Sequence, residues 1–421
     1  MKNSIRHFIY VFVSFLILLF LLYFTSNIFM RDDACERYEN FKKSKTDYDV
    51  LFFGSSHVLN AIFPMQLWND YGITSYNLAW HGMTVIPSYW ILQTSVSYHK
   101  PKIAVLDILG INNDSKDISY PYFHGFYDNF PISKTKISAI NDLCYSHKMK
   151  LEFYVPFYSY HSRWQERHFI SDLKSRIKWI LGGYSSHDVT KGAELRIGVK
   201  MNTTFDMSVN KYEGKESVGI EYARKFINYC RQNEIEPVFM FIPYSEQKNL
   251  YEWRDALISI LEKENVSFID LTNEIVDFEI DQFDQNSHLN PSGAKKVTEV
   301  VGRKLVQNFS LNSHKSDVFF SSWKQDYEDY REYIFEKIST QSSFKNLLMM
   351  LNNSEVYANV CARDNISFTE TEQKLIFENR SRINFLTDNN IDYDVKIEVF
   401  SIETNDLICE RNFSVDKVII Q

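Results

Sequence analysis

The sequence predicts an α/β fold built on a parallel β-sheet, and three observations lead to this fold class. Segments 48–54 and 237–243 are short, nearly continuous apolar runs, which is the pattern of strands buried on both faces. Such runs alternate along the chain with amphipathic segments of helical length, and this alternation implies a parallel sheet with right-handed crossovers. Two of the runs end in glycine, at Gly54 and Gly110, where a tight turn is expected.

The first expected element is the segment 8–30, which contains no charged residue. A helix needs about 20 apolar residues to cross a bilayer, so this segment is long enough to be a transmembrane anchor after a short tail, residues 1–7. A cleaved signal peptide is the alternative, but its apolar region is shorter and ends at small residues. We therefore expect a retained anchor. Basic residues lie on both sides of it, so the positive-inside trend does not fix its orientation.

Residues 31–47 are charged and polar, and we expect a short tether there. The next segment, up to about Ile111, reads as strand, helix, short strand, helix and strand. Residues 113–215 then interrupt this order as an insertion with a helix predicted over 162–181. The insertion is either a lid or substrate platform, or a helical subdomain with its own core. In the first case substrate would contact four of its aromatic side chains, those of Tyr120, Tyr122, Phe123 and Trp164.

The α/β alternation resumes at Ser217. We expect a helix to Gln232, a strand over 237–243, a helix over 246–263 and a strand over 266–271. A last helix is expected from Pro291 to about Asn308, because proline suits the first turn of a helix.

A small accessory domain is expected over residues 315–421. The segment 317–351 is charged and aromatic, and we expect it to be helical. From Glu355 onward, short β-like runs alternate with Asn and Asp turns, including 393–402 and 413–420. The domain is therefore predicted to be β-rich or α/β.

Composition excludes some classes of partner and site. The net charge of −8 argues against a nucleic acid partner, because phosphate binding needs a basic surface. The aromatic share of 16% is high, and such residues either build core or, on a surface, stack on sugar rings. The five cysteines show neither a C-x-x-C pair nor a metal-ligand spacing, so we expect no metal site, and their odd, scattered set does not indicate a disulfide framework. We also expect no cofactor. Cys230 falls in a helical pattern and is expected to be a core residue.

Candidate catalytic residues follow the predicted strands. Ser56 comes directly after the turn at Gly54, Gly82 lies in a loop after a short strand, and Asn112 follows the strand that ends near Gly110. In open α/β sheets, ligands bind outside the carboxyl ends of the strands. His288 lies in a polar loop just before the last helix. Taken singly, each of these residues also fits an ordinary turn or a solvated loop.

In this order, the residues resemble the four blocks of the SGNH (GDSL-like) hydrolase superfamily, over roughly residues 46–309. The resemblance implies a three-layer, flavodoxin-like sandwich, taken here as residues 48–309. It implies Ser56 as the nucleophile and His288 as the base. The oxyanion donors would be the amides of Ser56 and Gly82 and the side chain of Asn112, because negative charge that develops on oxygen needs donors already in place.

Two positions depart from the family pattern. Ser55 stands where many members have Asp. The family acid lies three residues before the histidine, which is Gln285 here, and Asp284 lies one residue further back. Either a bulged loop brings Asp284 to His288 and completes a catalytic triad, or the site works as a Ser–His dyad.

The anchor, the SGNH-like segment, the insertion and the accessory domain together resemble bacterial polysaccharide O-acetylation proteins of the alginate type and DltD of teichoic-acid D-alanylation. This resemblance implies a single-pass protein of the cell membrane with an extracytoplasmic catalytic domain. It would transfer an O-acyl group, first of all acetyl, to a cell-surface glycan through an acyl-serine. The acyl donor would come through a membrane-bound O-acyltransferase partner. The alternatives are an esterase or deacylase, and a non-catalytic glycan-binding component with a vestigial site.

Overall fold

The computed structural model describes residues 2–30, 35–116, 120–182, 187–200, 209–242, 248–272, 276–284, 288–352, 355–364, 366–388 and 392–414. The chain divides into two compact units. The helical unit comprises 1–45, 93–98 and 116–188, and the α/β unit comprises 46–92, 99–115 and 189–421.

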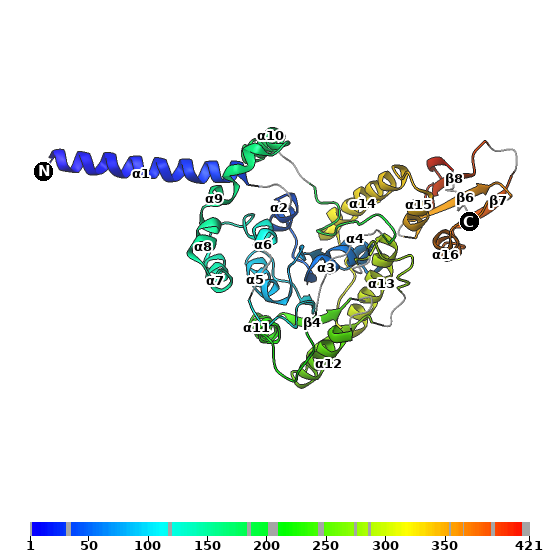
Figure 1. The fold of residues 1–421 in the computed structure, drawn as a ribbon, viewed down its shortest axis with the longest axis horizontal. Coiled ribbons are helices and arrows are strands. Elements are labelled where there is room, and N and C mark those ends of the chain that lie inside the picture. Colours follow the sequence, from blue (N-terminus) through cyan, green and yellow to red (C-terminus); the bar gives the residue numbers. More distant parts are fainter. Residues whose placement is uncertain are drawn as a thin grey trace. The chain divides into compact units, whose positions relative to one another are not determined.

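Five parallel strands of the described chain form the central sheet of the α/β unit, in the order β2-β1-β3-β4-β5. Figure 1 labels one of them, β4. Their bounds are β1 (Val50–Phe53), β2 (Ser75–Asn77), β3 (Ile103–Asp107), β4 (Glu236–Phe241) and β5 (Ser267–Asp270). This is the order of the flavodoxin-like doubly wound sheet, in which ligands bind where the strand order reverses. The reversal lies at β1, which pairs with both β2 and β3. The loop after β1 is therefore at the position expected for chemistry.

Helices cover both faces of this sheet, as the resemblance implies for a three-layer sandwich. Alternate strand residues such as Phe52 join a buried cluster with Val58 and Val301, which come from the helices on one face. On the other face, Phe53 packs against Phe226, with ring centroids 5.9 Å apart. The bounds are α3 (Ser56–Ala61), α4 (Pro64–Tyr71) and α13 (Pro291–Asn308) on the first face, and α11 (Val218–Gln232) and α12 (Lys248–Lys263) on the second, with α5 (Val85–Val96) between β2 and β3 along the chain.

The predicted elements of the sheet region correspond closely to the observed ones. The helix from Pro291 has the predicted bounds, and the strands predicted over 237–243 and 266–271 are β4 and β5. These elements could be predicted because each has a local pattern of apolar residues in the sequence. Cys230 of α11 is fully buried, as a core residue should be.

The carboxyl-terminal segment belongs to the same compact unit as the central sheet. Trp323 of α14 (Ser321–Ser339) packs against Trp68 of α4, with ring centroids 5.6 Å apart, and donates a hydrogen bond from its ring nitrogen to Thr46. The segment expected to form a separate domain is thus joined to the sheet region through a buried tryptophan. Of the strand predicted over 413–420, residues 415–420 lie outside the described residues.

Within the described residues, this segment also has a four-stranded sheet of its own, in the order β7-β6-β8-β9. β6 and β7 are parallel with α16 between them along the chain, whereas β8 and β9 are antiparallel to their neighbours. The bounds are η2 (Val318–Phe320), α14 (Ser321–Ser339), α15 (Phe344–Leu351), β6 (Val356–Ala362), α16 (Glu370–Glu378), β7 (Ile383–Thr387), β8 (Val395–Ser401) and β9 (Leu407–Phe413).

The helical unit contains α1 (Lys2–Phe29), α2 (Cys35–Lys43), α6 (Tyr120–Tyr127), α7 (Lys134–Leu143), α8 (His147–Tyr154), α9 (Pro156–Tyr160), η1 (His161–Gln165) and α10 (Phe169–Ile180). Its core is aromatic. Tyr38 of α2 packs edge-on against Phe126 of α6, with ring centroids 4.8 Å apart. The expectation of a tether over 31–47 was wrong for α2, because Tyr38 and Phe41, three residues apart on one helical face, are both fully buried.

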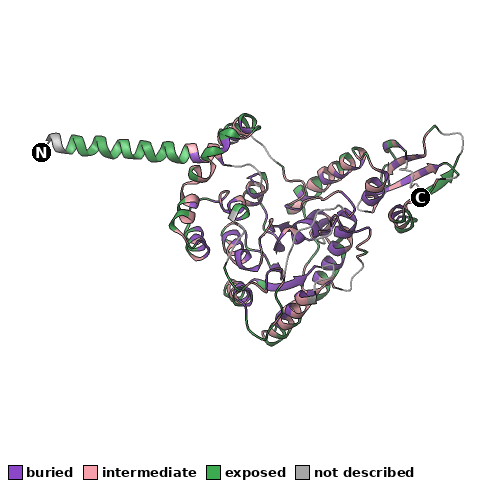
Figure 2. Cartoon of the chain, in the orientation of Figure 1, coloured by how far each residue is buried: buried purple, intermediate pink, exposed green. Residues whose placement is uncertain are grey.

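The apolar anchor segment is helical. Residues Ile5–Phe29 of α1 form a helix that is long and apolar enough to cross a bilayer. Its most apolar window has no buried residue, and Figure 2 shows exposure along most of the helix.

Candidate active site

A tight turn after β1 presents the candidate nucleophile. Gly54 has φ +149°, and a Cβ atom there would lie 2.5 Å from Val58 Cγ2, so this position suits only glycine. Ser55 is the N-cap of α3, and its hydroxyl accepts a hydrogen bond from the amide of His57. Ser56 is therefore the first helical residue. Its backbone N–H is one of the first four of the helix, which have no hydrogen-bond acceptor within the helix.

The hydroxyl of Ser56 meets the ring of His288. Ser56 Oγ lies 2.8 Å from His288 Nε2, and His288 Nδ1 lies 2.8 Å from Asp284 Oδ2. An ionised carboxylate only accepts hydrogen bonds, so Nδ1 carries the ring proton and Nε2 presents a lone pair to Ser56. The structure thus brings together all three of the predicted catalytic residues.

The loop around Asp284 explains how an acid four residues before the histidine reaches it. Gln282 and Leu289 form an isolated antiparallel bridge, and the amide of Phe283 donates to the carbonyl of His288 at 2.7 Å. These bonds close the loop, so that Asp284 accepts from both the ring and the backbone amide of His288. The side chain of Asp284 is 5% exposed and that of His288 is 16% exposed. Gln285, the position that the family pattern predicts for the acid, lies outside the described residues.

Asn290 fixes this loop at the start of α13. Its side-chain oxygen accepts from the amides of Ser292 and Gly293, and its side-chain nitrogen donates to carbonyls of the loop, including that of Ile280 at 2.7 Å. The side chain is fully buried. The imidazole of His288 is therefore held two residues before a fixed helix cap.

Gly82 and Asn112, two of the predicted oxyanion donors, lie in different loops of the chain. Gly82 has φ +65°, and its loop is tied to the nucleophile turn by the amide of Trp80, which donates to the carbonyl of Gly54 at 3.1 Å. Asn112 donates from its side-chain nitrogen to the side-chain oxygen of Asn210 at 3.1 Å. An amide nitrogen has two N–H groups, so this bond uses one of the two donors of Asn112.

His57 is a neighbour of the site that the sequence analysis missed. Its ring is buried and lies against that of His288, with ring centroids 4.7 Å apart. Burial, and then the nearby His288, hold the pKa of His57 well below its usual value, so its ring is neutral near pH 7. A second histidine directly after the serine was visible in the sequence, but its packing against His288 depends on the tertiary fold.

Asp107, at the end of β3, is a second missed neighbour. It is buried, and a Cβ atom on Gly54 would lie 3.0 Å from that of Asp107, which places this carboxyl beside the nucleophile turn. Burial raises the pKa of Asp107 to about 7, although the amides of Leu109, Ile242 and Ile108 partly oppose this by donating hydrogen bonds. Asp107 therefore titrates near neutral pH.

The aromatic residues predicted as a substrate platform all belong to the helical unit. Phe123 is fully buried against Phe153, with ring centroids 5.1 Å apart, so its assignment to a substrate surface was wrong and it is a core residue. Tyr122 and Trp164 are 42% and 65% exposed and stay predictions. The side chain of Tyr120 lies outside the described residues.

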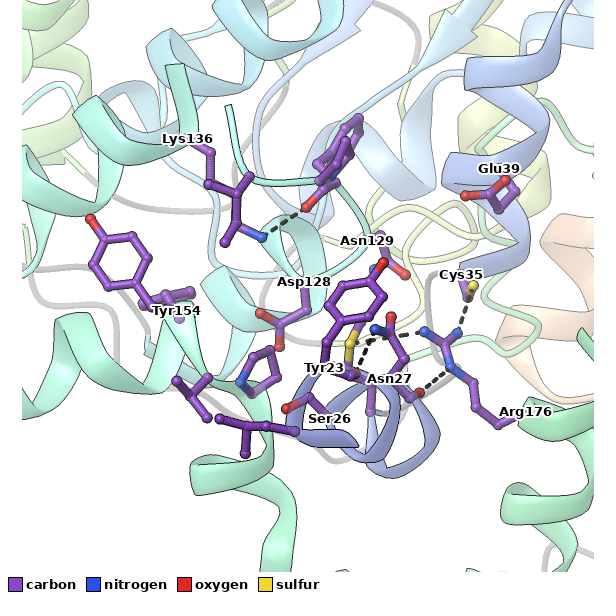
Figure 3. A pocket seen from close by; sticks show the side chains of 18 of the residues that line it. Tyr23, Ser26, Asn27, Cys35, Glu39, Asp128, Asn129, Lys136, Tyr154 and Arg176 are labelled. Atoms are coloured by element: carbon purple, nitrogen blue, oxygen red, sulfur yellow. Dashed lines mark hydrogen bonds between the residues drawn. The ribbon is translucent and has the colours of Figure 1, made fainter. Parts of the chain in front are cut away.

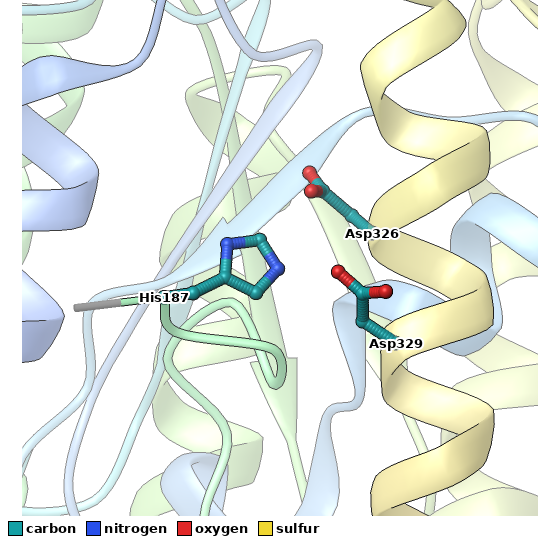
Figure 4. Close-up of side chains that lie close together, drawn as sticks. All are labelled: His187, Asp326 and Asp329. Carbon is teal, nitrogen blue, oxygen red and sulfur yellow. The ribbon is translucent and has the colours of Figure 1, made fainter. Parts of the chain in front are cut away.

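Two acidic residues lie one helical turn apart on α14. Figure 4 shows Asp326 and Asp329 together with His187. His187 belongs to the helical unit, and Asp326 forms an ion pair with Lys191 at 2.5 Å. We therefore assign no metal site to these three residues.

Comparisons with known proteins give similar structures only. No protein-family model and no curated protein matches the chain. A candidate lipolytic protein of the G-D-S-L family from Desulfitobacterium hafniense is 12% identical, with 61% of this chain and 99% of that one covered and a TM-score of 0.31. A candidate acylhydrolase from Bacteroides fragilis is 8% identical, with 66% and 95% covered and a TM-score of 0.32.

A third similar structure is described as a candidate platelet activating factor from Streptococcus pneumonia. It is 13% identical, with 70% of this chain and 99% of that one covered and a TM-score of 0.31. TM-scores of this size carry no conclusion about chemistry, which is therefore derived from the side chains of this chain.

Proposed function

We propose that this protein transfers an O-acyl group, first of all acetyl, to a cell-surface polysaccharide through an acyl-serine at Ser56. The observation that carries this proposal is the continuous hydrogen-bonded series from Ser56 through His288 to Asp284. A serine hydroxyl is a weak nucleophile, and a base within hydrogen-bond reach, itself oriented by an acid, is the arrangement that activates it.

The reaction has two halves. In the first, Ser56 Oγ attacks the acyl carbonyl while His288 Nε2 takes the hydroxyl proton, and the resulting oxyanion receives hydrogen bonds from the amides of Ser56 and Gly82 and from Asn112. His288 then gives the proton to the leaving group, and the acyl-serine remains. In the second half, His288 deprotonates the acceptor hydroxyl, whose oxygen attacks the carbonyl of the acyl-serine. The bond between Ser56 Oγ and the acyl group then breaks, and His288 returns the proton to Ser56 Oγ. Asp284 stabilises the imidazolium in both halves.

The identities of the glycan acceptor and of the acyl donor are the most specific part of the proposal. The sequence resemblance to polysaccharide O-acetylation proteins supports a glycan hydroxyl as acceptor and catalytic residues outside the cytoplasm. The apolar helix α1 supports attachment to a membrane. The acyl group would be delivered by a membrane-bound O-acyltransferase partner. Tyr122 and Trp164 are exposed aromatic residues of the kind on which sugar rings stack.

An esterase or deacylase is the second candidate, and the same three residues favour it. Water in place of the glycan hydroxyl would turn the second half of the reaction into hydrolysis. A vestigial site was suggested by the glutamine at the expected acid position, and Asp284 at 2.8 Å from His288 Nδ1 removes that reason.

The first experiment tests the acyl-serine. A fluorophosphonate probe should label the full-length protein at Ser56, as read by mass spectrometry of peptides. Ser56→Ala should abolish both labelling and cell-surface acylation. Ser55→Ala is the matched control, because it removes the adjacent hydroxyl and leaves Ser56. Labelling should persist, slowed only a few-fold by the loss of the helix cap. Unchanged surface acylation in the Ser56→Ala strain would refute both enzymatic candidates.

The second experiment separates transferase from esterase. Release of p-nitrophenol from its acetate should be slow in buffer and accelerate when an acceptor oligosaccharide is added, with the acyl group recovered on the sugar. Rapid release that is indifferent to oligosaccharide would favour the esterase.

A further inference from the structure

A cavity of about 520 Å³ lies entirely within the helical unit (Figure 3). Its walls come from the carboxyl-terminal half of α1, from α2, from the segment between α6 and α7 together with Lys136 of α7, from the junction of α8 and α9, and from Arg176 of α10. The volume falls within the roughly 300–1,000 Å³ of small-molecule sites. None of the residues in the proposed reaction lines it.

One wall of the cavity is continuous with the apolar surface of α1. Leu19, Leu22 and Tyr23 line the cavity, and all three belong to the segment that is apolar enough to cross a bilayer. Their exposed fractions are 45%, 37% and 70%, so the same residues also face outward. When α1 lies in a membrane, the side of the cavity formed by these residues faces the lipid acyl chains.

The lining of the cavity also includes a buried cation. Lys136 is 3% exposed, and its ammonium group donates to the carbonyls of Tyr127 and Phe130 at 2.7 and 2.8 Å. Burial, together with the nearby positive charge of Lys42, lowers the pKa of Lys136 to about 8, although the negative charge of Asp128 opposes this. An anionic group beside the two lysines would offset both the cost of burying the Lys136 ammonium group and its repulsion by Lys42.

Two buried acceptors lie next to this cation. Asp128 Oδ2 accepts from the ring of His124 at 2.9 Å and from the hydroxyl of Tyr160 at 2.7 Å. Asp128 Oδ1 and Asn129 Oδ1 are buried and have no hydrogen-bond partner among the described residues. Buried acceptors of this kind are normally satisfied, so they point to a ligand that carries several N–H or O–H donors.

Two other cations that line the cavity also bond to groups of the protein. Lys42 forms an ion pair with Glu39 and donates to the carbonyl of Asn129 at 2.8 Å. Arg176 donates to the carbonyl of Asn27 at 2.7 Å and to the sulfur of Cys35 (Figure 3). Cationic and anionic side chains thus share one lining, and this suits a zwitterion better than a simple anion.

We propose that this cavity binds an aminophospholipid of the phosphatidylethanolamine kind. Its phosphate lies beside Lys42 and Lys136, and its ammonium group donates to Asp128 Oδ1 and Asn129 Oδ1. Its acyl chains leave along Leu19 and Leu22 and continue in the bilayer around α1. The site requires the apolar surface of α1 to be covered by lipid or by detergent, and it is independent of the acyl chemistry proposed for Ser56.

Lipid retention by the full-length protein tests this site. The detergent-solubilised protein is incubated with equal amounts of phosphatidylethanolamine and phosphatidylglycerol, and retained lipid is counted by native mass spectrometry. The wild type should retain phosphatidylethanolamine at least fivefold over phosphatidylglycerol. Equal retention of the two lipids, or a preference for phosphatidylglycerol, would overturn the proposal.

Paired variants locate the binding. Lys42→Gln should lower phosphatidylethanolamine retention about tenfold, whereas Lys43→Gln, a neighbour on the same helix that is 72% exposed and outside the cavity lining, should leave it unchanged. Asp128→Asn should erase the preference between the two lipids, because it removes the charge that recognises the ammonium group. Identical retention by Lys42→Gln and Lys43→Gln would count against the site.

Two further measurements guard against misfolding and against simple anion binding. Ile132 is 61% exposed and lines the cavity, so Ile132→Trp should obstruct the cavity and reduce retention while leaving the helix content unchanged. Inorganic phosphate at millimolar concentration should not displace the lipid, because it lacks both the ammonium group and the chains. Full retention by Ile132→Trp, or displacement of the lipid by phosphate, would overturn the proposal.

Discussion

The described residues include two buried His–Asp pairs in which the two residues are four positions apart, one pair in each unit. His288 and Asp284 lie 2.8 Å apart, and His124 and Asp128 lie 2.9 Å apart, in both cases through the Nδ1 atom of the ring. The carboxylate of each pair is almost fully buried, at 5% and 4% exposed. By these measures the two pairs are alike.

The pairs differ in what the rest of the ring contacts. The Nε2 atom of His288 faces the hydroxyl of Ser56, whereas the ring of His124 stacks on Phe153, with ring centroids 3.8 Å apart. Asp284 belongs to a loop that also anchors the backbone of His288, whereas Asp128 directly follows a helix that contains His124. A His–Asp pair is therefore not a catalytic site by itself. The position of a nucleophile, set by the turn after β1, distinguishes the two.

Replacing the two histidines gives the largest expected contrast. His288→Gln should lower kcat/KM for acyl-serine formation by roughly 10³-fold to 10⁶-fold, because Ser56 loses its base. His124→Gln should leave kcat/KM of the folded protein within a few-fold and instead lower the melting temperature. Rates normalised to the fraction of folded protein measure the first effect, and circular dichroism measures the second. Comparable losses of activity in both variants would abolish the distinction between the pairs.

Replacing the two acids sharpens the same contrast. Asp284→Asn should reduce kcat/KM by roughly 10²-fold to 10⁴-fold, because the imidazole loses the partner that fixes its tautomer and stabilises its charged form. Asp128→Asn should leave the rate nearly unchanged. Gln285→Ala is a further control at the position where the family pattern predicts the acid. If that variant lost more activity than Asp284→Asn, the assignment of the acid would be wrong.

Asp107 extends the comparison to a buried carboxyl that accepts backbone hydrogen bonds. Its pKa is about 7, and that of an unfolded aspartate is about 3.9, so the folded chain holds the proton over this range and the unfolded chain does not. The free energy of unfolding should therefore fall as pH rises from about 4 to about 7, by about 4 kcal/mol, and then level off.

Hydrogen exchange measures this effect locally. The opening free energy of the β3 amides should decline with pH in the wild type and stay nearly flat in Asp107→Asn, after correction for the intrinsic exchange rate. A parallel decline in both proteins would show that another group titrates there.

The frame of the α/β unit was predictable because it depends on local periodicity. The apolar runs that became β1, β4 and β5 are continuous in the sequence, and Pro291 indicates where α13 begins. Ser56 and His288 could be picked out because each occupies a turn next to such an element.

The rest depended on contacts that no local pattern reveals. The role of Asp284 follows from the bridge between Gln282 and Leu289, and the spacing alone left a dyad equally possible. α2 is only nine residues long, and its two core aromatics are surrounded by charged residues. Phe123 looked like Tyr122 in the sequence, yet one is buried and the other is 42% exposed, because aromatic residues serve core and surface alike.

Two helix caps provide the smallest test of the comparison. Ser55 caps α3 by accepting from His57, and Ser133 caps α7 by accepting from Lys136, so each serine satisfies one amide that its helix leaves without a partner. Replacing either by alanine should cost about 1 kcal/mol of stability. Only Ser55→Ala should also lower kcat, by a few-fold, because α3 begins with Ser56 and a frayed first turn displaces its hydroxyl from His288. Denaturation midpoints and single-turnover rates of the two variants, measured side by side, separate these effects. A kcat loss in Ser133→Ala as large as that in Ser55→Ala would mean that the turn after β1 has no special part in placing the nucleophile.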